Sequence, residues 1–184
     1  MSEPNLIDAT LAVLATQGAA FEAVLLIASA LHKAVQWRHL EDVVRRFASV
    51  HPALAPAALG GVAALEIAAG GLLFVPGLRV MGAVAAALVW TVYLGLIVRA
   101  FVQGRRDVDC GCTFGGAQRP LGAYQLMRNV VLLGLALFIA RATVGTPAVA
   151  VQGSQMVAAC ALLALYGALD QVMALQPLRG GEVA

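Results

Sequence analysis

The sequence predicts an all-α membrane protein, a polytopic bundle of four core transmembrane helices with a fifth helix beside them. Of the 184 residues, 61% are hydrophobic and only 12% are charged. That charged fraction is about half of what an average soluble domain carries. The hydrophobic residues also gather into runs of about 20, the length that a helix needs to cross a bilayer. Such a surface is suited to lipid rather than to water.

Five apolar segments are long enough to cross the membrane. The predicted spans are residues 16–35, 57–75, 78–101, 121–140 and 154–175. Pro76-Gly77 predicts a tight turn between the second and third spans, and small residues such as Gly82 allow a neighbouring helix to approach the third span closely. The polar stretches are too short to fold alone, so we expect a single domain over residues 1–184.

A short amphipathic helix is expected between the first two spans. Leu40, Val43, Val44 and Phe47 recur at helical spacing among charged residues, which is typical of a helix that lies in the membrane interface. Trp37 directly before it stands where an interfacial aromatic residue is expected. The net charge of +2 is too small to indicate a nucleic-acid partner.

The polar loop 102–120 carries two cysteines one residue apart, Cys110 and Cys112, with Gly111 between them. A disulfide across so small a ring departs from relaxed geometry and is therefore easily reduced, and the glycine relieves the backbone constraint. The residues around the pair are mostly charged or small: Arg105, Arg106, Asp107, Asp109, Gly115, Gly116 and Arg119. The arginines favour the thiolate form, whereas the two aspartates oppose it.

Two other interpretations of the cysteine pair stay open. The thiols could bind a soft metal such as Cu(I) or zinc, but a structural zinc site takes about four ligands, and no second cysteine pair or nearby histidine completes one. The thiols could also be reduced and merely tolerated in a glycine turn. The third cysteine, Cys160, stands in an apolar run and is predicted to be an inert core thiol.

Ionisable residues within the predicted spans are candidate functional groups, since each costs about 2.5 to 3.5 kcal/mol at a helix centre. Glu66 lies eight residues after Ala58, and Arg128 lies eight residues after Pro120. Both are thus roughly 12 Å from the same face, which predicts an ion pair between them. Arg128 could also direct positive potential toward the thiols. Glu22 is a third acidic group within a span.

His32 and Lys33 end the first span at the face that carries the cysteines. We expect their side chains to snorkel into the interface, and a cation there would also raise the thiolate fraction of a nearby cysteine.

The distribution of basic residues predicts that the cysteine loop faces the cytoplasm. With five spans, the loops after the first and third spans share one side with the C-terminus. That side holds Lys33, Arg38, Arg45, Arg46, Arg99, Arg105, Arg106, Arg119 and Arg179. The opposite side holds only Arg79 and Arg141, and basic residues gather on the cytoplasmic side of inner-membrane proteins.

A set of short motifs resembles the methylamine utilisation protein MauE family, within the broader DoxX-like group of small helical membrane proteins. The resemblance covers about residues 18–141. It rests on Ala30-Leu31-His32-Lys33, Glu66, Gly104-Arg105-Arg106, Asp109-Cys110-Gly111-Cys112, Phe114-Gly115 and Arg128-Asn129. One departure is visible, because the family usually reads Cys-Gly-Cys-Phe-Gly and here Thr113 intervenes.

The resemblance implies a role in maturing the small (beta) subunit of methylamine dehydrogenase, alongside a thioredoxin-like partner, MauD. That subunit is periplasmic, rich in disulfides and carries a tryptophan-derived quinone. A periplasmic substrate favours periplasmic thiols, whereas the arginine distribution favours the cytoplasmic side, so both orientations in the inner membrane stay open.

The sequence therefore predicts a membrane thiol–disulfide component, a candidate oxidoreductase with Cys110 and Cys112 as the catalytic pair. The expected supporting and loop residues are Arg128, Asn129, Glu66, His32, Lys33, Gly111, Phe114 and Gly115. No metal ligands are assigned and the sequence implies no particular cofactor, although a quinone is a candidate. The alternatives are a non-catalytic scaffold that docks the thioredoxin-like partner, and a carrier of a soft metal.

Overall fold

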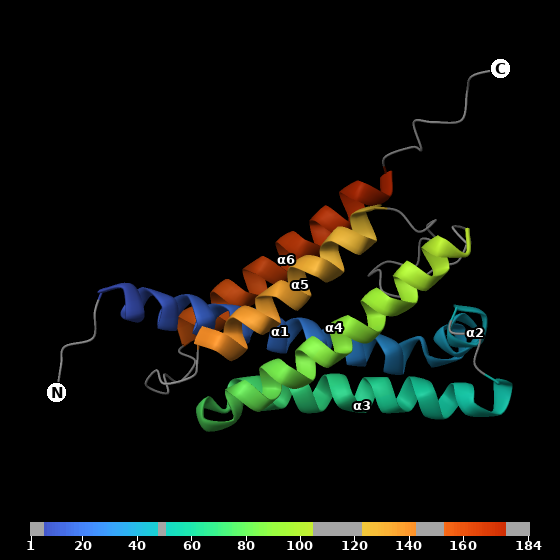
Figure 1. Cartoon of the computed structure of the whole chain (residues 1–184), viewed down its shortest axis with the longest axis horizontal. Helices are drawn as coiled ribbons and strands as arrows, with labels where there is room; N and C mark the ends of the chain where they lie inside the picture. Colours follow the sequence, from blue (N-terminus) through green and yellow to red (C-terminus); the bar gives the residue numbers. More distant parts are fainter. Residues whose placement is uncertain (1–5, 48–50, 105–122, 143–152, 176–184) are drawn as a thin grey trace, which may run out of the picture.

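The computed structural model describes residues 6–47, 51–104, 123–142 and 153–175, and within these ranges its regular secondary structure is helical (Figure 1). The helices are α1 (Leu6–Val35), α2 (Trp37–Phe47), α3 (Ala55–Phe74), α4 (Arg79–Val102), α5 (Ala123–Ala142) and α6 (Gly153–Leu175). All of these except α2 are long and apolar enough to cross a membrane. The chain is thus a multi-pass membrane protein, and the predicted fold class is confirmed.

The helices lie at the five predicted spans, with one clear difference in length. α1 begins at Leu6, ten residues before the predicted start, because residues 6–15 are also apolar and contain no proline or glycine that would end the helix. Short 3₁₀ turns, Pro52–Leu54 and Pro76–Leu78, lead into α3 and α4, and the second of them is the turn predicted at Pro76-Gly77.

α1 occupies the centre of the bundle, where it contacts α3, α5 and α6 and, over a shorter length, α4. α4 completes the packing by contacting both α3 and α5. α1 and α4 finish at the end of the bundle where α2 lies and where α3 and α5 begin (Figure 1). We call this end the α2 end. The cysteine loop joins α4 to α5 there, but Cys110, Gly111, Cys112, Phe114 and Gly115 lie outside the described residues.

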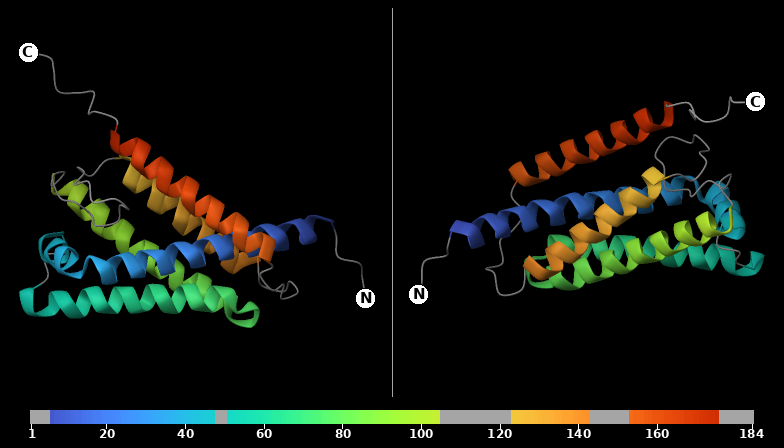
Figure 2. Two further views of the ribbon diagram at one scale, coloured as in Figure 1. Left: turned by 180° about the vertical axis from the view of Figure 1, so that it is seen from behind. Right: turned by 45° about the horizontal axis from the view of Figure 1, so that its top comes forward.

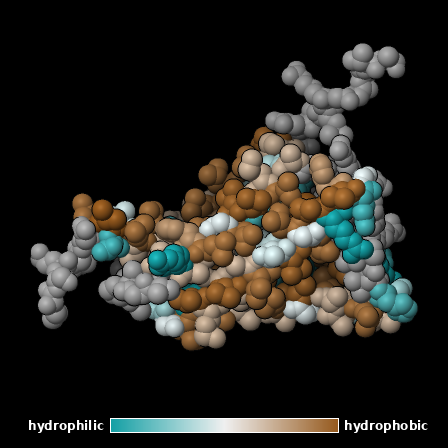
Figure 3. Space-filling view, in the orientation of Figure 1, coloured by the Kyte–Doolittle hydropathy of each residue, from teal (hydrophilic) through white to brown (hydrophobic). Residues whose placement is uncertain are grey.

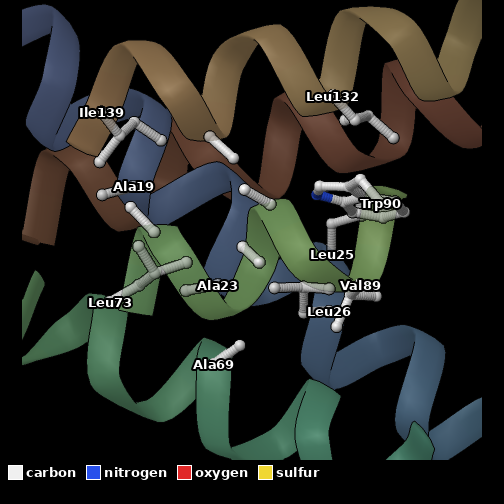
Figure 4. Close-up of a cluster of buried hydrophobic side chains, with 14 residues drawn as sticks. Ala19, Ala23, Leu25, Leu26, Ala69, Leu73, Val89, Trp90, Leu132 and Ile139 are labelled. Atoms are coloured by element: carbon white, nitrogen blue, oxygen red, sulfur yellow. The ribbon is translucent and has the colours of Figure 1, made fainter. Parts of the chain in front are cut away.

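The core between the helices is built from small and branched apolar side chains (Figure 4). Its larger buried members are Leu25, Leu26, Leu73, Val89, Trp90, Leu132 and Ile139. Many other large apolar side chains point outward, among them Val84, Leu88 and Val92 of α4. Figure 3 shows hydrophobic residues across the middle of the visible face and hydrophilic residues mostly toward its ends. This is the surface expected of a protein surrounded by lipid.

Glycine allows α4 to approach α3 closely, as the small residues of the third span predicted. A Cβ atom at Gly82 would lie 2.7 Å from the backbone nitrogen of Leu73 and 2.9 Å from the carbonyl carbon of Leu72. Gly70 has a similar role between α3 and α1, since its Cβ would lie 2.8 Å from Cγ1 of Ile27. Close backbone approach of this kind is the usual source of helix association in membranes.

α2 is the amphipathic helix that the sequence predicts. Leu40 is buried, and Val43 packs against Ile97 and Ala100 of α4. Among the described side chains of this helix, Arg38 and Asp42 are exposed, and Arg45 forms ion pairs with Glu41 and Asp42. The helix therefore uses its apolar face to cover one end of the bundle.

α6 lies at the outer edge of the bundle beside α1 and is the least buried of the five long helices (Figure 2). Cys160 on this helix is a free thiol with an exposed side chain. The prediction that Cys160 is a core thiol is therefore wrong. Because α6 packs through only one side, most of its apolar side chains face outward, and an apolar sequence context did not imply burial.

Candidate functional site

A buried ion pair between Lys33 of α1 and Glu66 of α3 forms the centre of the first polar cluster. Lys33 Nζ lies 2.8 Å and 3.0 Å from the two carboxylate oxygens, and both residues are buried. Lys33 Nζ also donates to Ser29 Oγ at 2.7 Å. Tyr93 of α4 donates its hydroxyl proton to Glu66 Oε1 at 2.6 Å. The cluster thus links three helices.

All three donors of the Lys33 ammonium group and both oxygens of Glu66 are hydrogen-bonded. The ammonium group has three N–H donors, and Lys33 directs them to Ser29 and to the two oxygens of Glu66. Glu66 accepts four hydrogen bonds: Oε1 accepts from Lys33, from Ser29 at 3.0 Å and from Tyr93, and Oε2 accepts from Lys33. Such saturation is the condition under which a buried ion pair is tolerated.

These contacts correct the prediction that Lys33 snorkels into the interface. Lys33 is 7% exposed because its ammonium group turns inward to Glu66. The neighbouring His32 is half-buried and belongs to the same end of α1. Sequence reasoning missed Ser29 and Tyr93. Ser29 stands one helical turn before Lys33, a spacing that places both on one face, whereas nothing in the sequence around Tyr93 indicated its contact with Glu66.

A second buried ion pair joins α5 to α6. Arg128 Nη1 lies 3.1 Å from Asp170 Oδ1, and both side chains are buried. The guanidinium carbon of Arg128 lies 5.8 Å from the centre of the Tyr166 ring. Asn129, the next residue, donates to the backbone oxygen of Gln125 at 2.9 Å. Asp170 was also missed, although it is a single acidic residue in a predicted span and such a residue is a signal of a buried partner.

The predicted ion pair between Glu66 and Arg128 is therefore wrong. The prediction was based on the equal depth of the two residues from the membrane face. Equal depth does not show that their helices are neighbours. α3 packs on α1 and α4, whereas α5 packs on α4 and α1. Glu66 consequently meets a lysine from α1, and Arg128 meets an aspartate from α6.

We expect a double-mutant cycle on Arg128→Met and Asp170→Leu to give a coupling energy of about 0.5 to 3 kcal/mol in the stability of the folded protein. Each single change removes one side of the ion pair and keeps the opposite charge buried, whereas the double change removes both charges. The measurement is chemical unfolding of the purified protein in detergent. Additive effects of the two changes would contradict the ion pair as a stabilising contact.

Among the described residues, the α2 end thus holds two buried cations, Lys33 and Arg128, and each faces a carboxylate from a neighbouring helix. α4 reaches this end with Gly104 at a φ of +68°, a left-handed conformation that commonly ends a helix at glycine. The described residues stop at Gly104 and resume at Ala123, five residues before Arg128, and both cysteines of the loop fall between these positions. Within the described ranges, no group of three or more His, Cys, Asp or Glu side chains is arranged to hold a metal ion.

Comparison with known proteins decides the family. The family model described as methylamine utilisation protein MauE matches residues 10–142. The chain belongs to the MauE family. It is 39% identical over 148 residues to methylamine utilization protein MauE of Paracoccus denitrificans, which covers 78% of this chain and 75% of that protein. It is also 27% identical over 113 residues to the MauE protein of Methylophilus methylotrophus, which covers 58% of this chain and 57% of that protein. No solved structure matches.

The match to the MauE family includes every residue that the sequence singled out as a candidate site. It also includes the whole of the Lys33–Glu66 cluster. The matched region ends at Ala142, so α6 and Asp170 lie outside it. In this MauE-family chain the buried Arg128 therefore takes its carboxylate partner from a helix that the family model does not cover.

Proposed function

We propose that this MauE-family protein is a membrane thiol–disulfide redox component that acts in maturation of the small subunit of methylamine dehydrogenase. Cys110 and Cys112 are the redox pair, and a thioredoxin-like protein of the MauD type is the exchange partner. The proposal concerns a methylamine utilisation protein whose described residues include five helices suited to cross the membrane. It assigns the chemistry to the loop between α4 and α5.

The observation that carries the proposal is the place where the cysteine loop is attached. α4 ends at Val102 and α5 begins at Ala123, and these two helix ends lie at the α2 end (Figure 1). Loops held at both ends by a rigid scaffold are common positions for reactive residues. Two thiols in a loop attached in this way would be available to a partner protein at one end of the bundle, which is what the proposal requires.

The buried cations are assigned a positioning role. Lys33 and Arg128 each face a carboxylate at about hydrogen-bond distance, so their positive charge is largely neutralised before it reaches the loop. The thiolate form then depends on the loop's own arginines, Arg105, Arg106 and Arg119. Glu66 and Arg128 support the chemistry by fixing the helices on which the loop is mounted.

The exchange proceeds in two displacements. A thiolate of the pair attacks one sulfur of the partner's disulfide, forms a mixed disulfide and releases the partner's other sulfur as a thiolate. The second cysteine of the pair, as its thiolate, then displaces the partner's bound sulfur. The partner disulfide is thereby reduced to a dithiol, and Cys110 and Cys112 are oxidised to a disulfide. Two electrons and two protons move in total, and no further oxidant takes part in this half of the cycle.

We expect Cys110→Ser or Cys112→Ser to accumulate a mixed disulfide with the partner, because the resolving thiol is missing. Membranes from cells that express each variant would be alkylated in acid and compared on non-reducing gels, with mass spectrometry to identify the trapped protein. Cys160→Ser is the matched control, since Cys160 lies on α6 far along the chain from the pair. It should trap nothing and leave methylamine-dependent growth unchanged.

The scaffold alternative gives the opposite result for the double variant Cys110→Ser/Cys112→Ser. Under the redox proposal this variant fails to mature the dehydrogenase, whereas a docking scaffold would retain full function without either thiol. Labelling intact cells with a membrane-impermeant thiol reagent, again in the Cys160→Ser background, reports which side the loop faces. Direct exchange with the periplasmic subunit requires labelling from the periplasmic side.

A further inference from the structure

Glu22, in the middle of α1, differs from the other buried acids of the described helices. Glu66 and Asp170 each pair with a cation from a neighbouring helix. Glu22 is 0% exposed, yet neither of its carboxyl oxygens has a hydrogen-bond partner among the described residues. Buried polar groups in native proteins almost always have a partner, which is either protein or ordered water.

Trp90 of α4 carries a second buried polar atom without a partner, and it lies beside Glu22. Its indole nitrogen is buried and makes no hydrogen bond within the described helices. The Trp90 side chain approaches the Glu22 carboxyl closely enough for a weak hydrogen-bonding interaction, but the contact does not reach the distance and angle of a full hydrogen bond. Figure 4 shows the Trp90 ring within the apolar core, close to Leu25, Val89 and Leu132.

We propose that Glu22 and Trp90 form an internal water-binding site at the centre of the bundle. The indole N–H can only donate a hydrogen bond, and carboxyl oxygens accept them. A ligand that satisfies both groups must therefore accept from Trp90 and donate to Glu22. Water does both, and a buried water typically makes about three hydrogen bonds, which equals the number of unpartnered atoms that the two side chains present.

Burial limits the size and the class of the ligand. Glu22 is fully buried and Trp90 is 6% exposed, so a ligand shared by these two groups is enclosed by the bundle and does not lie on its surface. A small ammonium ion would donate to Glu22 but would leave the indole N–H without an acceptor.

Glu22 also precedes Lys33 by eleven residues on α1, which places it about 16 Å further along the helix axis. The site is therefore separate from the polar clusters at the α2 end.

Radiolytic footprinting of the full chain in lipid nanodiscs tests this proposal. Short X-ray pulses split water into hydroxyl radicals, and a radical formed at a bound water oxidises the side chain next to it before diffusing away. The chain has two tryptophans, Trp37 and Trp90. Trp37 on α2 is half-buried and reports radicals from bulk water. We expect both to be oxidised in the wild-type protein, although Trp90 lies in the core.

Two variants and an isotope experiment complete the test. Glu22→Leu should lose the oxidation of Trp90 and keep that of Trp37, whereas Glu22→Gln, which retains a side-chain oxygen, should keep both. After rapid mixing with H₂¹⁸O, the wild-type product at Trp90 should retain ¹⁶O while the product at Trp37 gains ¹⁸O. The proposal is overturned if wild-type Trp90 is not oxidised, if its oxidation persists in Glu22→Leu, or if both tryptophans acquire ¹⁸O equally fast. The isotope arm needs no variant and so does not depend on how Glu22→Leu folds.

Discussion

Replacement of Lys33 by methionine is expected to destabilise the folded protein by about 3 to 5 kcal/mol, the usual cost of breaking a buried ion pair. The Glu66 carboxylate would then lose two of its four hydrogen bonds and its counter-charge while remaining completely buried. The measurement is the free energy of unfolding of the purified protein in detergent. Arg38→Met on α2 is the control, because Arg38 is exposed and such substitutions usually change stability by less than about 0.5 kcal/mol.

The double variant Lys33→Met/Glu66→Leu distinguishes the charge effect from lost packing. Removing both charges eliminates the unpaired carboxylate, and replacing a buried ion pair with apolar residues is often neutral or stabilising. We therefore expect the double variant to recover most of the stability that Lys33→Met loses. If it is less stable than the single variant, the ion pair is not the reason for the loss.

Gly82→Ala is expected to destabilise the packing of α4 on α3 by about 1 to 3 kcal/mol, the range typical of overpacking. The added methyl group would meet backbone atoms of Leu72 and Leu73 at 2.9 Å and 2.7 Å, and backbone atoms of a packed helix cannot rotate away as a side-chain tip can. The two helices must therefore separate. Thermal unfolding in detergent measures the loss, and a bulkier Gly82→Val should lose more.

Gly95→Ala supplies the matched control on the same helix. A Cβ atom at Gly95 would meet nothing within 4 Å, so only the higher helix propensity of alanine acts, and it stabilises a helix by up to about 1 kcal/mol. Equal effects of the two substitutions would show that close approach at Gly82 does not determine the packing.

The buried polar contacts suggest how an alanine-rich bundle fixes its arrangement. Apolar faces in lipid give little preference for one neighbour over another, since lipid is as apolar as the side chains. The Lys33–Glu66 pair with Tyr93 joins α1, α3 and α4, and the Arg128–Asp170 pair joins α5 to α6. Each ion pair can form only when its helices are neighbours in this arrangement. In a different arrangement, the same charges would be buried without these contacts.

Much of the architecture could be predicted from the sequence, because it depends on properties of single segments. Runs of about 20 apolar residues give the long helices, Pro76-Gly77 gives the turn between α3 and α4, and the spacing of Leu40 and Val43 gives the amphipathic α2. The family resemblance also came from local motifs, and the comparisons confirm it.

The partners of the buried charges were decided only by the tertiary structure. The sequence fixes how far Glu66, Arg128 and Glu22 lie along their helices, but not the direction in which each side chain points or which helix lies there. In the assembled bundle, Glu66 pairs with Lys33 and Arg128 pairs with Asp170. The Cys160 side chain is exposed, and Glu22 interacts with Trp90 in the core. Contacts between helices depend on rotation and neighbour choice, and both are set by the packing of the whole bundle.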